Sequence, residues 1–108
     1  MGKHILVAMT NPNDGRDDDF NDWYSNTHVH EVVAIPGFVS AQRFKLSPEQ
    51  AGDGSEFEYL AIYEIEAENA GAALQALKEA RPNLNMSDAL ADERAVFAYD
   101  QITEKITA

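Results

Sequence analysis

The sequence has 108 residues, with 19 acidic against 8 basic side chains and a formal net charge of −11. This length is typical of one domain spanning residues 1–108, whose small core would gain stability from an oligomer interface. Nucleic acids and anionic membranes bind clustered Lys and Arg, so neither is expected as a partner. The sequence lacks cysteine, which excludes disulfides and thiolate chemistry. With no signal-like N-terminus and no apolar run of membrane-spanning length, a cytoplasmic protein is predicted.

The first half of the chain is predicted to form a strand, a helix and a second strand. Residues 3–10 are apolar on both faces, so this strand must be covered on both sides. After a turn at residues 11–15, three aspartates suit the first turn of a helix expected over about residues 18–34. Pro36 cannot continue that helix, and residues 38–46 are predicted to form the second strand.

The second half is predicted to form a third strand, a second helix and a fourth strand. The third strand spans residues 56–65, and residues 67–80 form the helix, which Pro82 ends. A short extra helical turn is expected within residues 83–92, before a strand at residues 94–102. The apolar stripe of the helix consists of Ala70, Ala73, Leu74 and Leu77.

This βαββαβ order predicts an α+β fold of the ferredoxin-like type, a four-stranded antiparallel sheet with two helices on one face. Three of the strands carry apolar residues on both sides, so the second face of the sheet requires a cover. A sheet from a second copy is the simplest cover and predicts a homodimer, a dimeric α+β barrel. The alternative is a shallow amphipathic sheet that leaves some apolar side chains exposed.

The first predicted helix places polar groups on the side that should meet the sheet. At about 100° per residue, seven residues share this side, whereas Val29 and Val33 fall on the back. The seven are Phe20, Trp23, Tyr24, Thr27, His28, Glu31 and Ile35. Burying the hydroxyl, imidazole and carboxylate groups without partners would cost about 1–3 kcal/mol each, so they must bond to other groups or line a wet cavity.

Tyr24, His28 and Glu31 are spaced as neighbours on one helical surface. A carboxylate beside an imidazole can fix its tautomer, so His28 is a candidate general acid or base with Glu31 orienting it. Tyr24 would polarise a substrate oxygen. The alternative is a structural histidine whose hydrogen bonds are satisfied within the fold.

A metal site is not expected in this segment. His28 and His30 diverge by about 200° on a helix, so they cannot hold one metal together. The segment from His30 is similar to the zinc-protease motif His-Glu-x-x-His, but Ala34 stands where the second histidine is required.

Three side chains on the predicted strands are further candidates for ligand contact. Tyr59 and Tyr63 form a one-sided aromatic row with Phe57, which suits core packing or a flat apolar ligand. His4 lies near the start of the first strand on the side of Leu6, and it becomes relevant only if that side faces the helices.

Residues 19–38 carry a longer pattern: Trp-Tyr-x-x-x-His, a Glu three residues later, and a terminal Pro-Gly-Phe. This pattern resembles the EthD-like branch of the dimeric α+β-barrel superfamily, and the strand order extends the resemblance over the whole chain. The resemblance implies a ferredoxin-like subunit that pairs sheet to sheet, with a ligand pocket between each sheet and its own helices. It assigns the family histidine to His28 and its aromatic neighbours to Trp23 and Tyr24. The chain departs from the pattern at His30, where relatives often have Pro.

The resemblance also implies a range of chemistry. Members of the superfamily include cofactor-free monooxygenases, polyketide cyclases, dehydratases and haem-handling enzymes. The segment Lys3-His4-Ile5 is similar to the first strand of a plant polyketide cyclase, whose second catalytic histidine has no counterpart in residues 66–108. Its catalytic pair therefore does not transfer to this chain.

The expected function is an acid–base enzyme acting on a small aromatic or polyketide-like molecule without metal or organic cofactor. Its catalytic residues would be His28, Glu31 and Tyr24. Ligand contacts would come from Trp23, Tyr59, Tyr63 and His4. One alternative is a non-catalytic small-molecule-binding or structural dimer. Another is haem handling with His28 as axial ligand, which Glu31 and the acidic surface disfavour.

Overall fold

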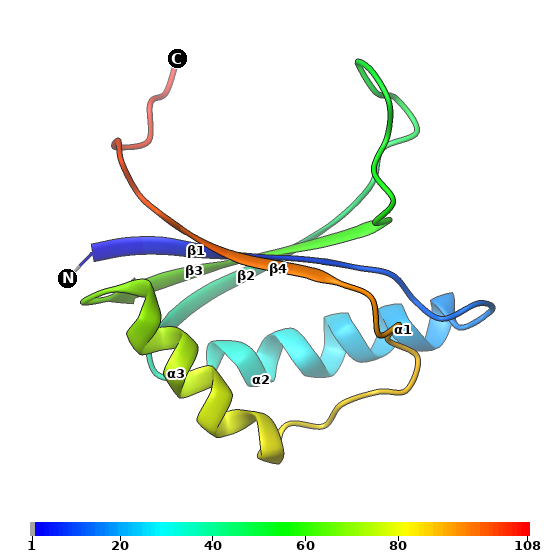
Figure 1. The fold of residues 1–108 in the computed structure, drawn as a ribbon, viewed down its shortest axis with the longest axis horizontal. Coiled ribbons are helices and arrows are strands. Elements are labelled where there is room, and N and C mark those ends of the chain that lie inside the picture. The colour runs from blue at the N-terminus through cyan, green and yellow to red at the C-terminus, as the bar shows by residue number, and fades with distance from the viewer. Residues whose placement is uncertain (1) are drawn as a thin grey trace.

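The computed structural model describes residues 2–108, which form a four-stranded antiparallel sheet with the helices on one face (Figure 1). The strand order across the sheet is β2-β3-β1-β4, which confirms the ferredoxin-like α+β fold. The elements are β1 (Gly2–Thr10), α1 (Asp17–Trp23), the π-helical turn η1 (Tyr24–His28), α2 (Val29–Val33), β2 (Phe38–Lys45), β3 (Tyr59–Ala67), α3 (Ala70–Ala80), the 3-10 turn η2 (Arg81–Asn83) and β4 (Ala95–Asp100). None of the helices within residues 2–108 is long and apolar enough to span a lipid bilayer.

The core lies between the helices and the inner face of the sheet. Side chains alternate along each strand, so every second residue of β1 and β3 points toward the helices. Leu6 and Ala8 of β1 are buried on this side, together with the polar Thr10. The buried residues of β3 are Tyr59, Ala61, Tyr63 and Ile65, as the alternation of its sequence predicted, and Ala67, which was expected to begin the following helix.

A π-helical turn interrupts the helix predicted over residues 18–34. A regular α-helix would turn Val32 about 80° away from Tyr24. The turn η1 accommodates one extra residue and rotates the following residues back by roughly that amount. Val32 and Ile35 are therefore buried on the same side as Phe20. Val29, predicted on the back of the helix, is instead partly buried against the core.

The second helix differs from its prediction at its start and along its buried side. α3 begins at Ala70 rather than residue 67, because the Asn69 side chain accepts a hydrogen bond from the Ala72 N–H at 2.9 Å. Leu74, predicted in the buried stripe, is 37% exposed. The residues that pack toward the core are Ala73, Ala76, Leu77 and Ala80. The helical turn expected within residues 83–92 lies earlier, at η2.

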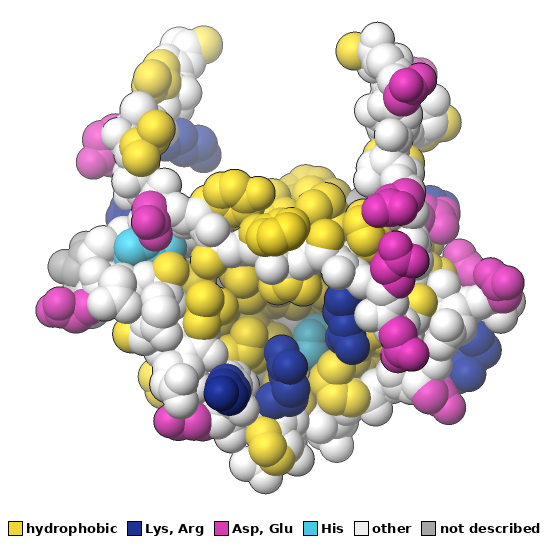
Figure 2. Space-filling model, viewed as in Figure 1, with side chains coloured by type: hydrophobic (Ala, Val, Ile, Leu, Met, Phe, Trp, Pro, Cys, Tyr) yellow, Lys and Arg dark blue, Asp and Glu magenta, His cyan; other side chains and the backbone are white. Residues whose placement is uncertain are grey.

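The outer face of the sheet is apolar and uncovered by the described chain. Its strands contribute large side chains that include Phe44, Phe97 and Tyr99, the last two both 53% exposed. The β2–β3 loop and the C-terminal segment both project from this side, and Figure 2 shows hydrophobic side chains gathered between them. Ile102 and Ile106 of the C-terminal segment are almost fully exposed.

Gly37, in the turn before β2, provides a test of how closely α3 packs against that turn. Its φ is +98°, and a Cβ there would lie 3.3 Å from the Ala73 Cβ, whereas Gly15 has a φ of +76° and open space around it. Gly15→Ala should reduce the free energy of unfolding by about 1 kcal/mol through backbone strain alone. Gly37→Ala should cost about 1 kcal/mol more, measured by urea denaturation. Equal losses for the two variants would contradict the close packing of Ala73 against Gly37.

Candidate functional site

A cavity of about 790 Å³ lies between the inner face of the sheet and the helices. Its lining includes Leu6, Ala8 and Thr10 of β1, Tyr63 of β3, and Tyr24, His28 and Val32 from the first helical segment. Five residues of the segment 84–90 and two arginines, Arg81 and Arg94, also line it. Figure 2 shows the hollow beneath the sheet, with a His side chain inside it and Lys or Arg side chains around it.

Two aromatic rings hold the His28 imidazole at this cavity. The indole of Trp23 stacks on it with ring centroids 4.7 Å apart and planes 26° apart. Tyr24 meets it edge-on at 5.0 Å. The Nδ1 atom is buried and, among residues 2–108, is the one buried side-chain polar atom without a hydrogen-bond partner. His28 is therefore fixed by packing, and its hydrogen-bonding capacity is not used within the fold.

The surroundings of His28 keep it neutral at physiological pH. Burial lowers the pKa of His28 to about 4, because desolvation disfavours the imidazolium. The Glu31 carboxylate acts in the opposite direction, and the charges of Arg94, Arg43 and Arg81 lower the pKa further. A neutral imidazole can accept a proton or donate one N–H bond, which favours the role of base over that of imidazolium acid.

Two tyrosine hydroxyls lie beside the histidine. The Tyr63 hydroxyl donates to the Tyr24 oxygen at 3.5 Å, and Thr10 is a second hydrogen-bonding neighbour of the Tyr24 hydroxyl. Burial raises the pKa of both phenols, so both remain protonated at neutral pH. The Arg43 guanidinium lies 4.5 Å from the centre of the Tyr24 ring and donates to Ser25 Oγ at 2.7 Å. These contacts hold the Tyr24 ring at the cavity with its hydroxyl protonated.

Glu31 does not orient His28 by a hydrogen bond, so that detail of the sequence prediction is wrong. Its carboxylate accepts hydrogen bonds from the Asn85 backbone N–H at 3.0 Å and from Asn85 Nδ2 at 2.9 Å. Trp23 Nε1 donates to the Asn85 carbonyl at 2.6 Å. The rotation introduced by the π-helical turn accounts for this, because it carries Glu31 away from the sheet. Glu31 and Trp23 thus anchor the cavity wall at Asn85.

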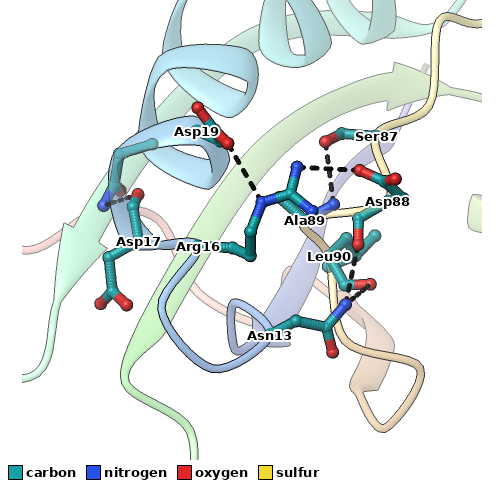
Figure 3. A network of polar contacts seen from close by, with 9 residues as sticks. Asn13, Arg16, Asp17, Asp19, Ser87, Asp88, Ala89 and Leu90 are labelled. Carbon is teal, nitrogen blue, oxygen red and sulfur yellow. Dashed lines mark hydrogen bonds and ion pairs between the residues drawn. The ribbon is translucent and has the colours of Figure 1, made fainter.

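A second set of contacts anchors the same wall near Asp88 (Figure 3). Arg16 donates to the Asp88 carboxylate at 2.9 Å and to Asp19 at 3.0 Å. The Asn13 side chain donates to the Asp88 carbonyl at 2.8 Å. The segment that closes the cavity is therefore tied to the first helix at one end and to the β1–α1 loop at the other.

Three of the four predicted ligand residues lie outside the lining of this cavity. Tyr59 packs against Phe20 with ring centroids 5.2 Å apart, and its hydroxyl accepts a hydrogen bond from Asn21 at 3.1 Å. His4 lies near the start of β1, where its Nδ1 is 2.8 Å from the Asp100 carboxylate. The side of β1 that carries His4 faces the helices, but the cavity ends before it. Trp23 supports the His28 ring without lining the cavity.

Sequence reasoning missed Thr10, Arg81 and Arg94, which the fold brings to the cavity from distant segments. Thr10 continues the inward alternation of Leu6 and Ala8, so the period of the first strand could have indicated it. The arginines follow or precede regular elements and carry no comparable signal. Within residues 2–108, no group of three or more His, Cys, Asp or Glu side chains is placed to hold a metal ion.

Solved structures of low sequence identity share the fold. A haem-degrading protein from Mycobacterium tuberculosis, with two haems bound in its active site, has a TM-score of 0.61 at 14% identity, covering 94% of this chain and 98% of that one. An EthD-like protein from Ralstonia eutropha has a TM-score of 0.58 at 15% identity, covering 97% and 96%. A dimeric ferredoxin-like protein of unknown function from Thermobifida fusca has a TM-score of 0.57 at 16% identity, covering 93% and 92%.

These likenesses define the class of the domain. The chain has the fold of the EthD-like and ferredoxin-like dimeric α+β-barrel proteins, as the pattern in residues 19–38 predicted. No family profile and no curated protein sequence matches the chain. At these identities the likeness concerns the fold, and the chemistry must be argued from the cavity itself.

The neutral state of His28 predicts a pH dependence of stability. The unfolded chain takes up a proton near pH 6.5, whereas folded His28 does so only near pH 4. The free energy of unfolding should therefore fall as the pH drops from 6.5 toward 4. By pH 5 this contribution should reach about 1–2 kcal/mol relative to pH 7.5.

Urea denaturation at pH 7.5 and pH 5.0 measures this contribution. His28→Phe should reduce the difference between the two pH values by that amount, while His30→Gln, at an exposed position, should leave it as in the wild type. The same pH dependence in wild type and His28→Phe would show that the buried imidazole does not resist protonation.

Proposed function

We propose that this protein is a cofactor-independent acid–base enzyme acting on a small aromatic or polyketide-like molecule bound in the cavity at His28. One observation carries the proposal: the neutral imidazole of His28, which makes no hydrogen bond to any described residue, lines a cavity of about 790 Å³. Ligand pockets commonly measure about 300–1,000 Å³. A histidine with a purely structural role would be sealed from solvent and satisfied by its neighbours.

The proposed step is the removal of a proton from carbon next to a carbonyl group. The C–H bond breaks, its proton moves to the His28 ring, and its electron pair forms the enolate. The Tyr24 O–H donates a hydrogen bond to the developing enolate oxygen, and Tyr63 supports Tyr24. A positioned base contributes about 10²–10⁴-fold in rate, which suits enolisation, cyclisation or dehydration. Glu31 would assist the proton transfer in two ways. Its negative charge favours the protonated imidazole, and its hydrogen bond from Asn85 anchors the cavity wall.

Exchange of α protons in deuterated water tests the proposal. The probe is 2-tetralone, a bicyclic aromatic ketone whose exchange is followed by proton NMR, with binding followed by thermal shift. The wild-type protein should raise the exchange rate, and His28→Ala should lower the protein-catalysed rate by about 10²–10⁴-fold. His30→Ala removes an exposed imidazole two residues away and serves as the matched control.

The same experiment separates the alternatives. Binding of 2-tetralone to the wild-type protein without any increase in exchange would favour the non-catalytic binding protein. Exchange that is unchanged in His28→Ala would remove His28 from the reaction. A haem titration that produces an absorbance band in the wild type and none in His28→Ala would favour haem handling instead.

We also infer that a second copy of the chain covers the outer face of the sheet. All four strands contribute apolar side chains to this face, and two projecting segments flank it (Figure 1). A sheet of the same shape placed face to face would bury these side chains. The flanking segments would then extend along the partner, which would account for the exposure of Ile102 and Ile106. The alternative remains a monomer with a shallow amphipathic sheet.

Light scattering coupled to size exclusion tests this pairing. The wild type should elute with twice the mass of one chain. Phe97→Lys should shift it to the monomer mass, because a charge buried between two sheets without a partner is strongly unfavourable. Leu74→Lys makes the same change at an exposed apolar position on α3 and should remain dimeric. A monomeric wild type at tens of micromolar would contradict the inference.

A further inference from the structure

Two arginines at the cavity have no anionic partner within the fold. Arg81 opens η2 and Arg94 directly precedes β4, and both line the cavity as exposed side chains. Neither forms an ion pair or a side-chain hydrogen bond with any residue of the described chain. The other two arginines are engaged, since Arg16 bridges two aspartates and Arg43 lies among aromatic rings.

This arrangement is unexpected for a chain with 19 acidic side chains and a net charge of −11. Surface arginines in such a chain have many carboxylates available to pair with. Two free guanidinium groups at one cavity therefore provide a positive region on an otherwise negative molecule, where Figure 2 shows Lys or Arg side chains around the hollow. Each guanidinium presents a planar set of donors that matches a carboxylate or phosphate group.

The acidic side chains at the same cavity do not cancel this region. Asp88 lines the cavity, but its carboxylate already accepts a hydrogen bond from Arg16 at 2.9 Å (Figure 3). Asp92 is the other carboxylate of the lining, and its charge opposes an incoming anion. Two free cationic groups thus face one free carboxylate.

The interior of the cavity differs from this charged rim. Leu6, Ala8, Val32 and Leu77 supply apolar surface, and the polar groups that reach it include Thr10, Tyr24, Tyr63 and His28. A ligand that satisfies both regions has an apolar body and one anionic end.

Building on the function proposed above, we propose that the cavity binds an apolar acid, whose carboxylate or phosphate group is held by Arg81 and Arg94. Its ring system lies against the apolar lining, and the carbon that reacts lies beside His28. The arginines act as specificity residues, because they select the charge of the ligand without contacting the reacting atoms.

A matched set of naphthalene derivatives tests this specificity by calorimetric titration. The three probes are 2-naphthoate, 2-naphthyl phosphate and the neutral 2-naphthamide. The wild type should bind the two anions about tenfold more tightly than the amide. The double variant Arg81→Gln/Arg94→Gln should lose this preference while binding the amide as before. Asp92→Asn should strengthen the binding of the anions, and Lys105→Gln, which removes one positive charge from the C-terminal segment, should change nothing.

The variants distinguish failure of this inference from failure of the proposed function. Equal binding of all three probes, or a preference that survives in the double variant, would overturn the role of the arginines. If binding were then still weakened in His28→Ala, the cavity at His28 would stand as the ligand site. A preference for only one anion would retain the arginine site and identify the carboxylate or the phosphate as its ligand. Absence of binding by all three probes would overturn the arginine site, whereas the exchange of 2-tetralone decides the proposed function.

Discussion

The π-helical turn at Tyr24–His28 is the constraint on which the rest of the site depends. It lets one helical segment satisfy two requirements that a regular α-helix cannot meet together. Phe20, Val32 and Ile35 must be buried in one core, while His28 must face a cavity beside that core. The extra residue of the turn brings both sets into place and releases Glu31 to bind Asn85. Single π-helical turns inside α-helices are frequently found at functional sites.

Burial governs the chemistry of the cavity more strongly than charge does. The molecule is highly acidic, and an acidic neighbourhood normally favours the protonated form of histidine. Desolvation of the His28 ring nevertheless dominates its pKa, and the only opposing influence of note comes from Glu31. The same low-polarity surroundings keep both phenols protonated. The neutral imidazole of His28, an acceptor, and the neutral hydroxyl of Tyr24, a donor, therefore lie side by side without a charged group between them.

Much of the fold could be predicted from sequence because its signals are local. Local signals include the alternation in β3, the aspartates that open the first helix and Pro36 after it. Each acts within a few residues, and together such signals indicate the order of strands and helices along the chain. The candidate site was predictable only in part, at His28, Tyr24 and Tyr63. Glu31 was assigned to the wrong partner because the prediction assumed a regular α-helix. A helical wheel drawn at about 100° per residue does not reveal a π-helical turn. Arg81 and Arg94 depend on tertiary contacts between distant segments, which periodicity does not encode.

The alternation along β1 has a consequence for how this protein can change over evolutionary time. Leu6, Ala8 and Thr10 form the floor of the cavity, while Ile5, Val7 and Met9 belong to the outer face. Inserting or deleting one residue within the strand would exchange these two sets, since each residue reverses the direction of the side chain. The strand can therefore accept many replacements of one apolar residue by another, but its length can change only by an even number of residues.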